Sequence, residues 1–520
     1  MDSPITRKAA YQLAQGWNIS SSVSVIIAVI YCIYQIYFHP LSRFPGPISS
    51  KLCNARALYY ALKGDSHLDI LRCHQKYGPV IRYTPSTVIW NNTTGLKGIY
   101  GVRRRVRKTR NYRFFDQGIQ NILTATDKNI HANRRRLLNP CFTDTAIKAY
   151  EPRILYHAQR FCHMLCPLEA RASAAGQPSW GPAIDMSEWC AYLAFDLMTE
   201  FVFGKGSNLL EKPKNRALLP MAEASLDWVA RLYYLQLPHP ELLTRVLFKI
   251  VNRRHGIFTR YIQANLKDRQ NLSPKDRGSD IFSYLVGSYD GYSEAKLSLE
   301  EIQSECQLLS VAGFDTVSTA LCATIFYLVH YPHAYTRLAN EIRTAFRSTT
   351  DIQPGEKLKA CEYLNACINE SLRISPPIST IVPREVEKGG ELIDGDFVPE
   401  GCVVGTSIYA IQRNPEYFPQ PHVYLPERWL TADKSHANAA FIPFSVGSRA
   451  CIGKTMAMSE LQTTIALFIW TFDFRLPDGY DGTGAKDSVA SKYKREGTKD
   501  VSLRTSHLLL RISISIYVGG

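Results

Sequence analysis

The sequence predicts a mainly α-helical fold with small β-sheets (α+β), in which one large domain follows an N-terminal transmembrane anchor. Apolar residues recur with helical periodicity from about residue 127 to residue 370. Residues 80–90 alternate in the manner of a β-strand. Beyond residue 373, closely spaced prolines and glycines shorten the expected elements to strands and turns.

Length and composition leave the number of domains open. The chain has 520 residues, of which 45% are hydrophobic and 21% charged, an ordinary globular composition. Single cores usually stop growing at about 250–300 residues, so the length allows two or three domains. One large helical domain around a buried cofactor fits equally well, and only the motifs decide between the two.

The cysteines indicate a reducing environment. There are 13 of them, an odd number, and no CxxC pair occurs. This pattern excludes a disulfide framework and a zinc site. Reduced thiols predict that the body of the protein faces a cytosol-like compartment.

The net charge of +15 suits nucleic acid, an anionic membrane surface or an acidic protein partner. The densest basic run consists of Arg103, Arg104, Arg105, Arg107, Lys108 and Arg110. It lacks the stacking aromatics or zinc spacing of a nucleic-acid module, which favours a solvated loop and no nucleic-acid partner.

Residues 17–38, WNISSSVSVIIAVIYCIYQIYF, contain no charged side chain and predict a single-pass anchor. As a helix they extend about 33 Å, enough to cross a hydrocarbon core. Trp17 and Tyr37 stand where interfacial aromatics belong. A signal peptide is the alternative, but the apolar stretch is long and no small-residue cleavage site follows.

The anchor divides the chain into four expected parts. Residues 1–16 are expected on the lumenal side. Residues 39–50 form a proline-rich hinge, whose HPLSRFPGP is stiff and non-helical because proline fixes φ and cannot donate a backbone hydrogen bond. Residues 51–520 form the main domain.

The sharpest motif is FSVGSRACIG, residues 444–453, which delivers Cys451 to the start of a predicted helix. Gly447 and Gly453 permit backbone geometry and close approach that a side chain would block. Backbone N–H groups and the helix dipole favour a thiolate at Cys451, the ligand that a heme iron needs for O–O cleavage. Arg449 is placed to reach a heme propionate, and Phe444 to shield the proximal face.

This string resembles FxxGxRxCxG, the heme signature of the cytochrome P-450 superfamily, at every defined position. The resemblance, closest to membrane-bound filamentous-fungal members, extends from about His39 to Leu476. It implies the cytochrome P-450 fold and a heme b cofactor with Cys451 as the axial metal ligand.

Two further segments carry the resemblance. Glu370 and Arg373 match ExxR, and Arg428 lies in a PERW segment. An exposed i,i+3 pair is the default interpretation, but the apolar neighbours favour a buried helix, where charges need partners. The resemblance implies that the three residues form a structural network behind the cysteine loop.

The string AGFDT lies inside the clearest predicted helix, residues 297–328. A glycine and an acid–hydroxyl pair oppose helix propensity there, and such conflicts often mark functional sites. The family motif (A/G)GxDT distorts its helix over the heme. The resemblance therefore implies that Thr316 holds water and oxygen, while Asp315 feeds protons toward it.

Less specific matches extend the expected heme site. In HANRRRL, Arg135 falls on the arginine of the family's WxxxR and is implied to bind a propionate, while His131 replaces the tryptophan. Arg384 resembles a further propionate arginine. It follows residues 378–382, which border the substrate in the family.

The resemblance implies a heme-thiolate monooxygenase that oxidises a lipophilic small molecule by hydroxylation, epoxidation or multistep oxidation in fungal secondary metabolism. No flavin- or nicotinamide-binding segment is visible, so NADPH–cytochrome P-450 reductase is the expected electron donor, and cytochrome b5 stays open as a second. Lys454 and residues 134–136 are the expected contacts. The expected location is the endoplasmic reticulum membrane, with the catalytic domain cytosolic.

Two alternatives stay open: a family member that rearranges or couples its substrate without inserting oxygen, and a non-catalytic heme-binding protein. The chain also departs from the family from about residue 477, where a Lys-rich stretch precedes ISISI, which alternates like a strand.

Overall fold

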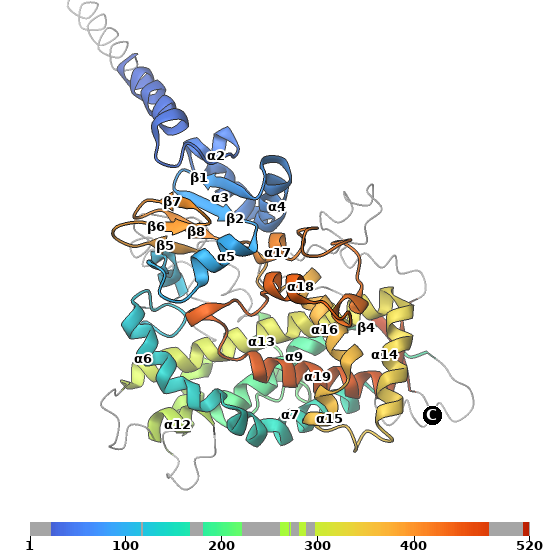
Figure 1. The fold of residues 1–520 in the computed structure, drawn as a ribbon. Helices are drawn as coiled ribbons and strands as arrows, with labels where there is room; N and C mark the ends of the chain where they lie inside the picture. Colours follow the sequence, from blue (N-terminus) through green and yellow to red (C-terminus); the bar gives the residue numbers. More distant parts are fainter. Residues whose placement is uncertain are drawn as a thin grey trace, which may run out of the picture.

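The computed structural model describes residues 22–115, 118–166, 180–220, 260–269, 271, 280–287, 297–477 and 513–518. Helices predominate in these residues and the sheets are small, which confirms the predicted mainly α fold (Figure 1). The described helical elements are η1 (Tyr34–Phe38), α2 (Ile48–Leu52), α3 (Ala55–Lys63), α4 (Ser66–Tyr77), α5 (Thr93–Tyr100), η2 (Arg110–Phe115), α6 (Lys128–Leu138), η3 (Asn139–Phe142), α7 (Asp144–Leu165), α9 (Met186–Phe203), η4 (Pro213–Asn215), α12 (Ile281–Gly287), α13 (Leu299–His330), α14 (Pro332–Ala345), α15 (Glu356–Lys359), α16 (Glu362–Ile374), α17 (Ile408–Ile411), η5 (Pro426–Trp429), α18 (Ser435–Ala440), η6 (Gly447–Arg449) and α19 (Lys454–Thr471).

The described strands form three sheets. They are β1 (Val80–Thr84), β2 (Thr87–Trp90), β3 (Val106–Lys108), β4 (Ile184–Asp185), β5 (Arg384–Val386), β6 (Glu391–Ile393), β7 (Asp396–Val398), β8 (Val403–Gly405), β9 (Phe472–Arg475) and β10 (Ser513–Val518). The largest sheet has the order β1-β2-β8-β5-β3, in which only β2 and β8 run parallel. The alternating stretch 80–90 is therefore not one strand but a hairpin that turns at Pro85 and Ser86.

Helix α13 is the centre of the helical part and packs against α9, α16 and α19 (Figure 1). Its first turn is fixed by a capping box, in which Ser298 Oγ accepts from Glu301 N at 3.2 Å and Glu301 Oε2 accepts from Ser298 N at 2.8 Å. Length and composition would allow α13 to cross a membrane, but 61% of its most apolar window is buried. It is therefore the core helix of the body.

The predicted anchor corresponds to the apolar helix Ser22–Phe38, which projects from the sheet end of the body (Figure 1). Residues 1–21, including the first part of the predicted anchor, lie outside the described residues. The connector is non-helical through Pro47, but α2 begins at Ile48, earlier than the expected end of the hinge at residue 50.

The C-terminal ISISI does form a strand, as its alternation predicts. Strand β10 pairs antiparallel with β9 and with β4, which joins the chain end to the body. Residues 478–512, which hold the Lys-rich stretch, lie outside the described residues.

Candidate cofactor and active site

Cys451 lies on the loop between η6 and α19, and backbone hydrogen bonds hold the loop in shape. Cys451 N donates to Phe444 O at 2.8 Å, and Ala450 N donates to Gly447 O at 3.0 Å. Gly447 has φ +78°, and a Cβ there would lie 1.9 Å from Tyr100 O. Glycine is thus required at Gly447 by both conformation and space.

Gly453 differs from the expectation. Its φ is −88°, and a Cβ would meet only the Phe142 ring, at 3.8 Å, among the atoms reported around it. The protein atoms around Gly453 therefore do not demand glycine.

The thiol of Cys451 is free, and its side chain is exposed at the wall of a cavity of about 440 Å³. Burial of the site raises its pKa above the usual value, while the N–H of Gly453 and the charges of Arg135 and Lys454 act in the opposite direction. The helix start was expected to lower the pKa of Cys451 and favour the thiolate, but burial outweighs this effect. A metal ion at the sulfur would supply the missing stabilisation, since a coordinating thiol is deprotonated outright.

The same cavity is bounded by the middle of α13, where Ala312, Asp315 and Thr316 line it together with Phe444. Thr316 Oγ1 donates to Ala312 O at 2.9 Å, within an α13 that runs without a break from Leu299 to His330. The distortion implied for this helix is thus absent over its described length. Most of the remaining lining is apolar, including Val317, Ala320, Leu372, Ile381 and Met456.

Gly313 serves the packing of α13. A Cβ on Gly313 would lie 2.3 Å from the sulfur of Met198 on α9. The glycine in AGFDT therefore lets two core helices approach closely.

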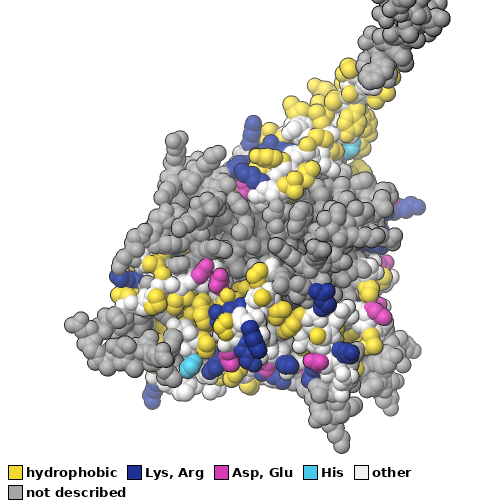
Figure 2. All heavy atoms as spheres, turned by 180° about the vertical axis from the view of Figure 1, so that it is seen from behind, with side chains coloured by type: hydrophobic (Ala, Val, Ile, Leu, Met, Phe, Trp, Pro, Cys, Tyr) yellow, Lys and Arg dark blue, Asp and Glu magenta, His cyan; other side chains and the backbone are white. Residues whose placement is uncertain are grey.

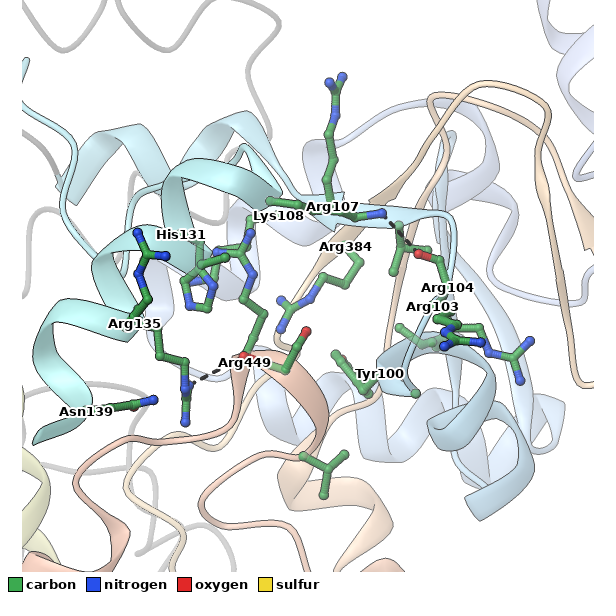
Figure 3. A pocket seen from close by; sticks show the side chains of 18 of the residues that line it. Tyr100, Arg103, Arg104, Arg107, Lys108, His131, Arg135, Asn139, Arg384 and Arg449 are labelled. Carbon is green, nitrogen blue, oxygen red and sulfur yellow. Dashed lines mark hydrogen bonds between the residues drawn. The ribbon is translucent and has the colours of Figure 1, made fainter. Parts of the chain in front are cut away.

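A second cavity, of about 800 Å³ (Figure 3), shares part of its lining with the first. Nine Lys or Arg residues and one His line it, and no acidic residue is among its described lining. Five basic residues line both cavities: Lys108, His131, Arg135, Arg384 and Arg449. They come from β3, α6, β5 and η6, so the tertiary structure brings together the predicted Arg449, Arg135, His131 and Arg384.

Charge crowding within this cluster is visible in its pKa values. Burial first, and then Arg384, lowers the pKa of Arg449 to about 10. Burial together with Arg449 and Lys108 lowers the pKa of His131 to about 3, so this imidazole is neutral near pH 7. Like charges in a buried wall are costly unless an anion compensates them.

Two arginines of the cluster, Arg135 and Arg449, also brace the cysteine loop, and Arg384 is held by its neighbouring backbone. Arg135 Nη1 donates to Ala450 O at 2.7 Å, and Arg449 Nη1 donates to Ala125 O at 2.8 Å. Arg384 Nη1 donates to Pro383 O at 3.0 Å. These contacts orient the guanidinium groups at the junction of the two cavities.

Lys108 was not predicted as a site residue, because the basic run of residues 103–110 was assigned to a solvated loop. It is buried on β3, where its ammonium donates to Leu123 O at 2.6 Å. Burial, and after it Arg384 and Arg449, holds its pKa well below the usual value. The alternation of Val106 and Lys108 on one face of a strand was the signal that could have found it.

Glu460 is a second residue that sequence reasoning missed. It lines the Cys451 cavity from α19, is 1% exposed, and neither carboxyl oxygen has a hydrogen-bond partner in the structure. Burial raises its pKa to about 8. Its place in the second turn of an apolar helix gave no chemical signal in the sequence.

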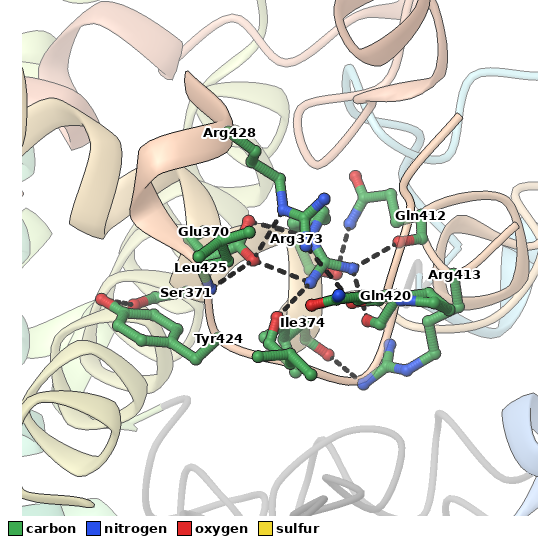
Figure 4. A network of polar contacts seen from close by, with 12 residues as sticks. Glu370, Ser371, Arg373, Ile374, Gln412, Arg413, Gln420, Tyr424, Leu425 and Arg428 are labelled. Atoms are coloured by element: carbon green, nitrogen blue, oxygen red, sulfur yellow. Dashed lines mark hydrogen bonds and ion pairs between the residues drawn. The ribbon is translucent and has the colours of Figure 1, made fainter. Parts of the chain in front are cut away.

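Glu370, Arg373 and Arg428 meet in one polar network (Figure 4). Arg373 and Glu370 are fully buried and form a two-bond pair of 2.8 and 2.9 Å, and Arg428 Nε donates to Glu370 Oε1 at 3.0 Å. Trp429 Nε1 and Leu425 N also donate to this carboxylate. Arg373 leads the opposing charges that lower the pKa of Glu370 against the effect of burial.

The network ties α16 to the chain between α17 and η5. Arg373 also donates to Gln412 O and Pro421 O at 2.8 Å each. Trp429 was not expected to take part, although the W of PERW adjoins the arginine that was. The buried charges are therefore fully hydrogen-bonded, as a buried ion pair requires.

A heme fits these residues. It presents an iron for one axial thiolate, a flat apolar ring, and two carboxylates at one edge. Cys451 matches the iron. The apolar lining between the cysteine loop and α13 matches the ring, and the basic cluster matches the carboxylates.

The comparisons with known proteins agree with this chemistry. The sequence model of the cytochrome P-450 family matches residues 45–489. The chain is 39% identical over 501 residues to cytochrome P-450 monooxygenase poxM of Penicillium oxalicum, covering 94% of this chain and 96% of that one.

It is also 36% identical over 469 residues to cytochrome P-450 monooxygenase atnE of Emericella nidulans, covering 88% and 90% of the two chains. A relative from Alternaria alternata is 38% identical over 456 residues, which cover 86% of each chain. Together with the residues of the site, these matches show that the chain belongs to the cytochrome P-450 family.

Proposed function

We propose that the chain is a monooxygenase that binds heme b with Cys451 as the axial ligand and oxidises a lipophilic small molecule. The observation that carries this proposal is the position of Cys451 on one wall of an apolar cavity, with Thr316 and Asp315 among the residues of α13 that line it. The basic cluster at the adjoining cavity supports it, because it supplies cations for the two propionates.

When bound, a thiolate-ligated heme supplies the activation of dioxygen. The chain's own residues bind, orient and deliver protons. Lys108, Arg384 and Arg449 would hold the propionates by charge-assisted hydrogen bonds, and neutral His131 would donate a weaker one. Arg135 braces the cysteine loop through Ala450 O.

At the α13 wall of the cavity, the hydroxyl of Thr316 would hold a proton at Oγ1, and Asp315 would supply protons from the half-buried part of α13. The hydrogen bond from Thr316 Oγ1 to Ala312 O positions that hydroxyl. Apolar residues around it exclude bulk water and favour a lipophilic substrate.

We also propose the setting in which the enzyme works. Helix Ser22–Phe38 anchors it in the endoplasmic reticulum membrane, with the body in the cytosol. NADPH–cytochrome P-450 reductase delivers electrons at the basic side that carries residues 134–136 and Lys454, and cytochrome b5 is a second candidate donor. The fungal origin of the relatives, which are named as monooxygenases, is consistent with the proposed role in secondary metabolism.

The test is the carbon monoxide difference spectrum of the reduced, detergent-solubilised full chain. Wild type is expected to give the Soret band of a thiolate-ligated heme, and Cys451→Ala to lose it. Cys53→Ala is the matched control, since Cys53 is an exposed cysteine outside both cavities and should keep the band. A folded, heme-reconstituted wild type with a histidine-type band would overturn the assignment of Cys451.

Turnover separates the enzyme from a heme carrier. With a fungal reductase and a panel of terpenoids and polyketides, NADPH consumption should rise with substrate and yield an oxygenated product. Thr316→Ala is expected to divert NADPH consumption into peroxide while keeping the Soret band. Heme binding without any substrate-dependent consumption would favour the non-catalytic alternative.

A further inference from the structure

Polar side chains of α13 hold a loop that forms part of the Cys451 cavity. The loop consists of residues 119–125, between η2 and α6, and its Ile122 and Leu123 line the cavity. Ile122 N donates to both carboxyl oxygens of Glu305, at 2.9 and 3.1 Å. Because these partners are 183 positions apart in the chain, the position of this wall depends on α13.

A second tether lies one residue earlier in α13. Ser304 Oγ donates to Ile119 O at 3.0 Å and accepts from Asn121 Nδ2 at 3.2 Å. Within the loop, Asn121 Oδ1 accepts from Leu123 N and Thr124 N, both at 3.1 Å. The loop is therefore a compact turn, and two adjacent side chains of α13 set its position.

The other side of the loop is attached to the basic cluster at the junction of the two cavities. Lys108 Nζ donates to Leu123 O at 2.6 Å, and Arg449 Nη1 donates to Ala125 O at 2.8 Å. The loop thus lies between an acid on α13 and cations that are proposed to bind the propionates. Any movement of the loop would change the wall of the Cys451 cavity.

Glu305 is an unusual tether because it is an acid enclosed in the protein. The acidic side chains visible on the face drawn in Figure 2 lie at the surface, whereas Glu305 is 0% exposed. A buried carboxylate needs an opposite charge to offset its loss of hydration. Among the described residues Glu305 forms an ion pair with Arg134 of α6, whose Nε lies 3.8 Å from Glu305 Oε1.

This compensation is incomplete. Arg134 also donates to Glu301, one turn earlier in α13, so one guanidinium faces two carboxylates. Lys108 on β3 is the other cation that acts on Glu305, and its ammonium is already used by the loop. The charge of Glu305 is therefore shared among partners that have other contacts.

The neighbouring ionisable groups on the side of α12 supply no free cation. Cys306 follows Glu305 in α13, and burial, then Glu305 and Asp280, raise the pKa of its thiol well above the usual value. The thiol is therefore uncharged. Asp280, which precedes α12, is paired with Arg269.

The protonation of Glu305 is sensitive to pH near neutrality. Burial raises its pKa to about 7, although the Ile122 N–H and Arg134 act in the opposite direction. Movement of the loop would hydrate the carboxyl and return its pKa toward the ordinary value of 4.5. A closed loop is therefore favoured most below about pH 4.5, and this preference is lost as the pH rises through about 7.

We propose that Glu305 is a positioning residue for the proposed oxidation: it holds the 119–125 loop as a wall of the Cys451 cavity, and loss of its proton loosens this wall so that ligands enter faster. The proposal rests on the proposed function, since only a bound heme makes this cavity the place where a substrate reacts. The ionised carboxylate still accepts from Ile122 N, but its burial costs more than the hydrogen bond returns.

The first experiment follows the loop by amide hydrogen exchange in the heme-reconstituted full chain. The protection factor of a peptide that contains residues 119–125 should fall by up to roughly 100-fold as the pH rises from about 5 to about 8. In Glu305→Gln the amide oxygen still accepts from Ile122 N and never ionises, so protection should stay constant.

Two further variants complete this experiment. Glu305→Ala removes the acceptor and should lower the protection of the loop at every pH. Glu300→Gln is the matched control, because Glu300 is an exposed acid on the same helix, and it should follow wild type. Circular dichroism and the carbon monoxide band report that each variant is folded and holds heme.

The second experiment measures entry into the cavity. Phenyl isocyanide, an uncharged heme ligand, is mixed with the reduced protein in a stopped-flow instrument, and the Soret shift gives its association rate. The rate should rise several-fold with pH in wild type and stay constant in Glu305→Gln. Ser304→Ala removes the neighbouring tether but keeps the acid, so it should raise the rate and retain the pH trend.

The outcomes are distinguishable. Wild-type protection in Glu305→Ala would overturn the positioning role. A pH trend that persists in Glu305→Gln, or a wild type without a trend, would overturn the role of the proton. A folded wild type without the thiolate carbon monoxide band would overturn the proposed function, while the exchange of the loop, which needs no heme, would still test Glu305.

Discussion

The environment of Lys108 in the fold disfavours the positive charge of its side chain. Lys108 is buried beside Arg384 and Arg449, and this surrounding lowers its pKa well below the usual value. Such a group destabilises the protein without an anion and binds one strongly when it is present. The same reasoning applies to the whole basic cluster at the junction of the two cavities.

We predict that Lys108→Met weakens heme retention and does not lower the stability of the heme-free protein. A charge-assisted hydrogen bond contributes about 1.5–3 kcal/mol, so the heme dissociation constant should rise roughly 10- to 100-fold. Transfer of heme to an acceptor protein measures this. Arg136→Gln is the control, because Arg136 lines only the larger cavity and is exposed. Equal heme loss in the two variants would contradict the prediction.

Glu460 predicts a dependence of stability on pH. Its pKa is raised by burial to about 8, from an ordinary value of 4.5. An acid with a raised pKa in the folded state contributes stability that is fully present below about pH 4.5 and is lost as the pH rises through about 8. Glu460→Gln keeps the shape and never ionises.

The melting temperature of Glu460→Gln should therefore gain on that of wild type between about pH 5 and about pH 9. Thermal melts followed by circular dichroism at several pH values give the difference. Glu416→Gln changes an exposed acid and should show no such trend. If the difference in melting temperature between Glu460→Gln and wild type were the same at every pH, Glu460 would be hydrogen-bonded and charged in solution.

At the scale of the elements, the packing of α9 against α13 positions the helix that carries the proposed catalytic residues. The capping box at Ser298 fixes where α13 begins, and Gly313 lets α9 approach the segment that carries Asp315 and Thr316. The contact between Gly313 and Met198 therefore helps to set how closely this part of α13 approaches α9 at the cavity wall, which all four residues line.

Gly313→Ala is expected to lower the free energy of unfolding by about 1–3 kcal/mol through overpacking against Met198. Helix propensity alone would predict a gain of about 1 kcal/mol, the opposite sign. Urea denaturation gives the free energy of unfolding and so distinguishes a loss from a gain. Adding Met198→Ala should recover part of the loss, because it clears the space that the new methyl group needs.

At the scale of the molecule, the cavity proposed to hold the heme lies where the hydrophobic cores meet. Leu372 and Met456 belong to the helical core, Ile408 to the sheet core, and Ile381 to a smaller third cluster, yet all four line the Cys451 cavity. Binding a cofactor there joins the parts of the body. It should stabilise the fold by mass action.

The reactivity of the cysteines reports whether the cofactor covers Cys451 and whether the thiols are reduced throughout the molecule. All 13 are free, and only Cys53 and Cys451 are exposed. In the heme-bound protein a thiol reagent should modify Cys53 alone, and in the heme-free protein it should modify Cys53 and Cys451. After denaturation without a reducing agent it should modify all 13 thiols. Fewer reactive thiols after denaturation would indicate disulfides and would contradict a cytosolic body.

Much of the site was predictable because its motifs are local in sequence. The turn at Gly447, the cysteine before a helix and the acid–hydroxyl pair in AGFDT each depend on a few neighbouring residues. Lys108, Glu460 and Trp429 were not found, since their roles come from burial and from partners distant in the chain. The hairpin within residues 80–90 was missed because strand alternation does not reveal the turn at Pro85.

By itself the sequence determined the fold class, the family resemblance, the order of the motifs and the identity of the cysteine that follows the glycine turn. Only the tertiary structure decided which basic residues surround the cofactor cavity, that Gly453 is not required by its protein neighbours, and that Arg82 joins the projecting helix to the body. The physical reason is that local geometry is encoded by adjacent residues. Desolvation, charge crowding and cavity shape arise only when distant segments pack together.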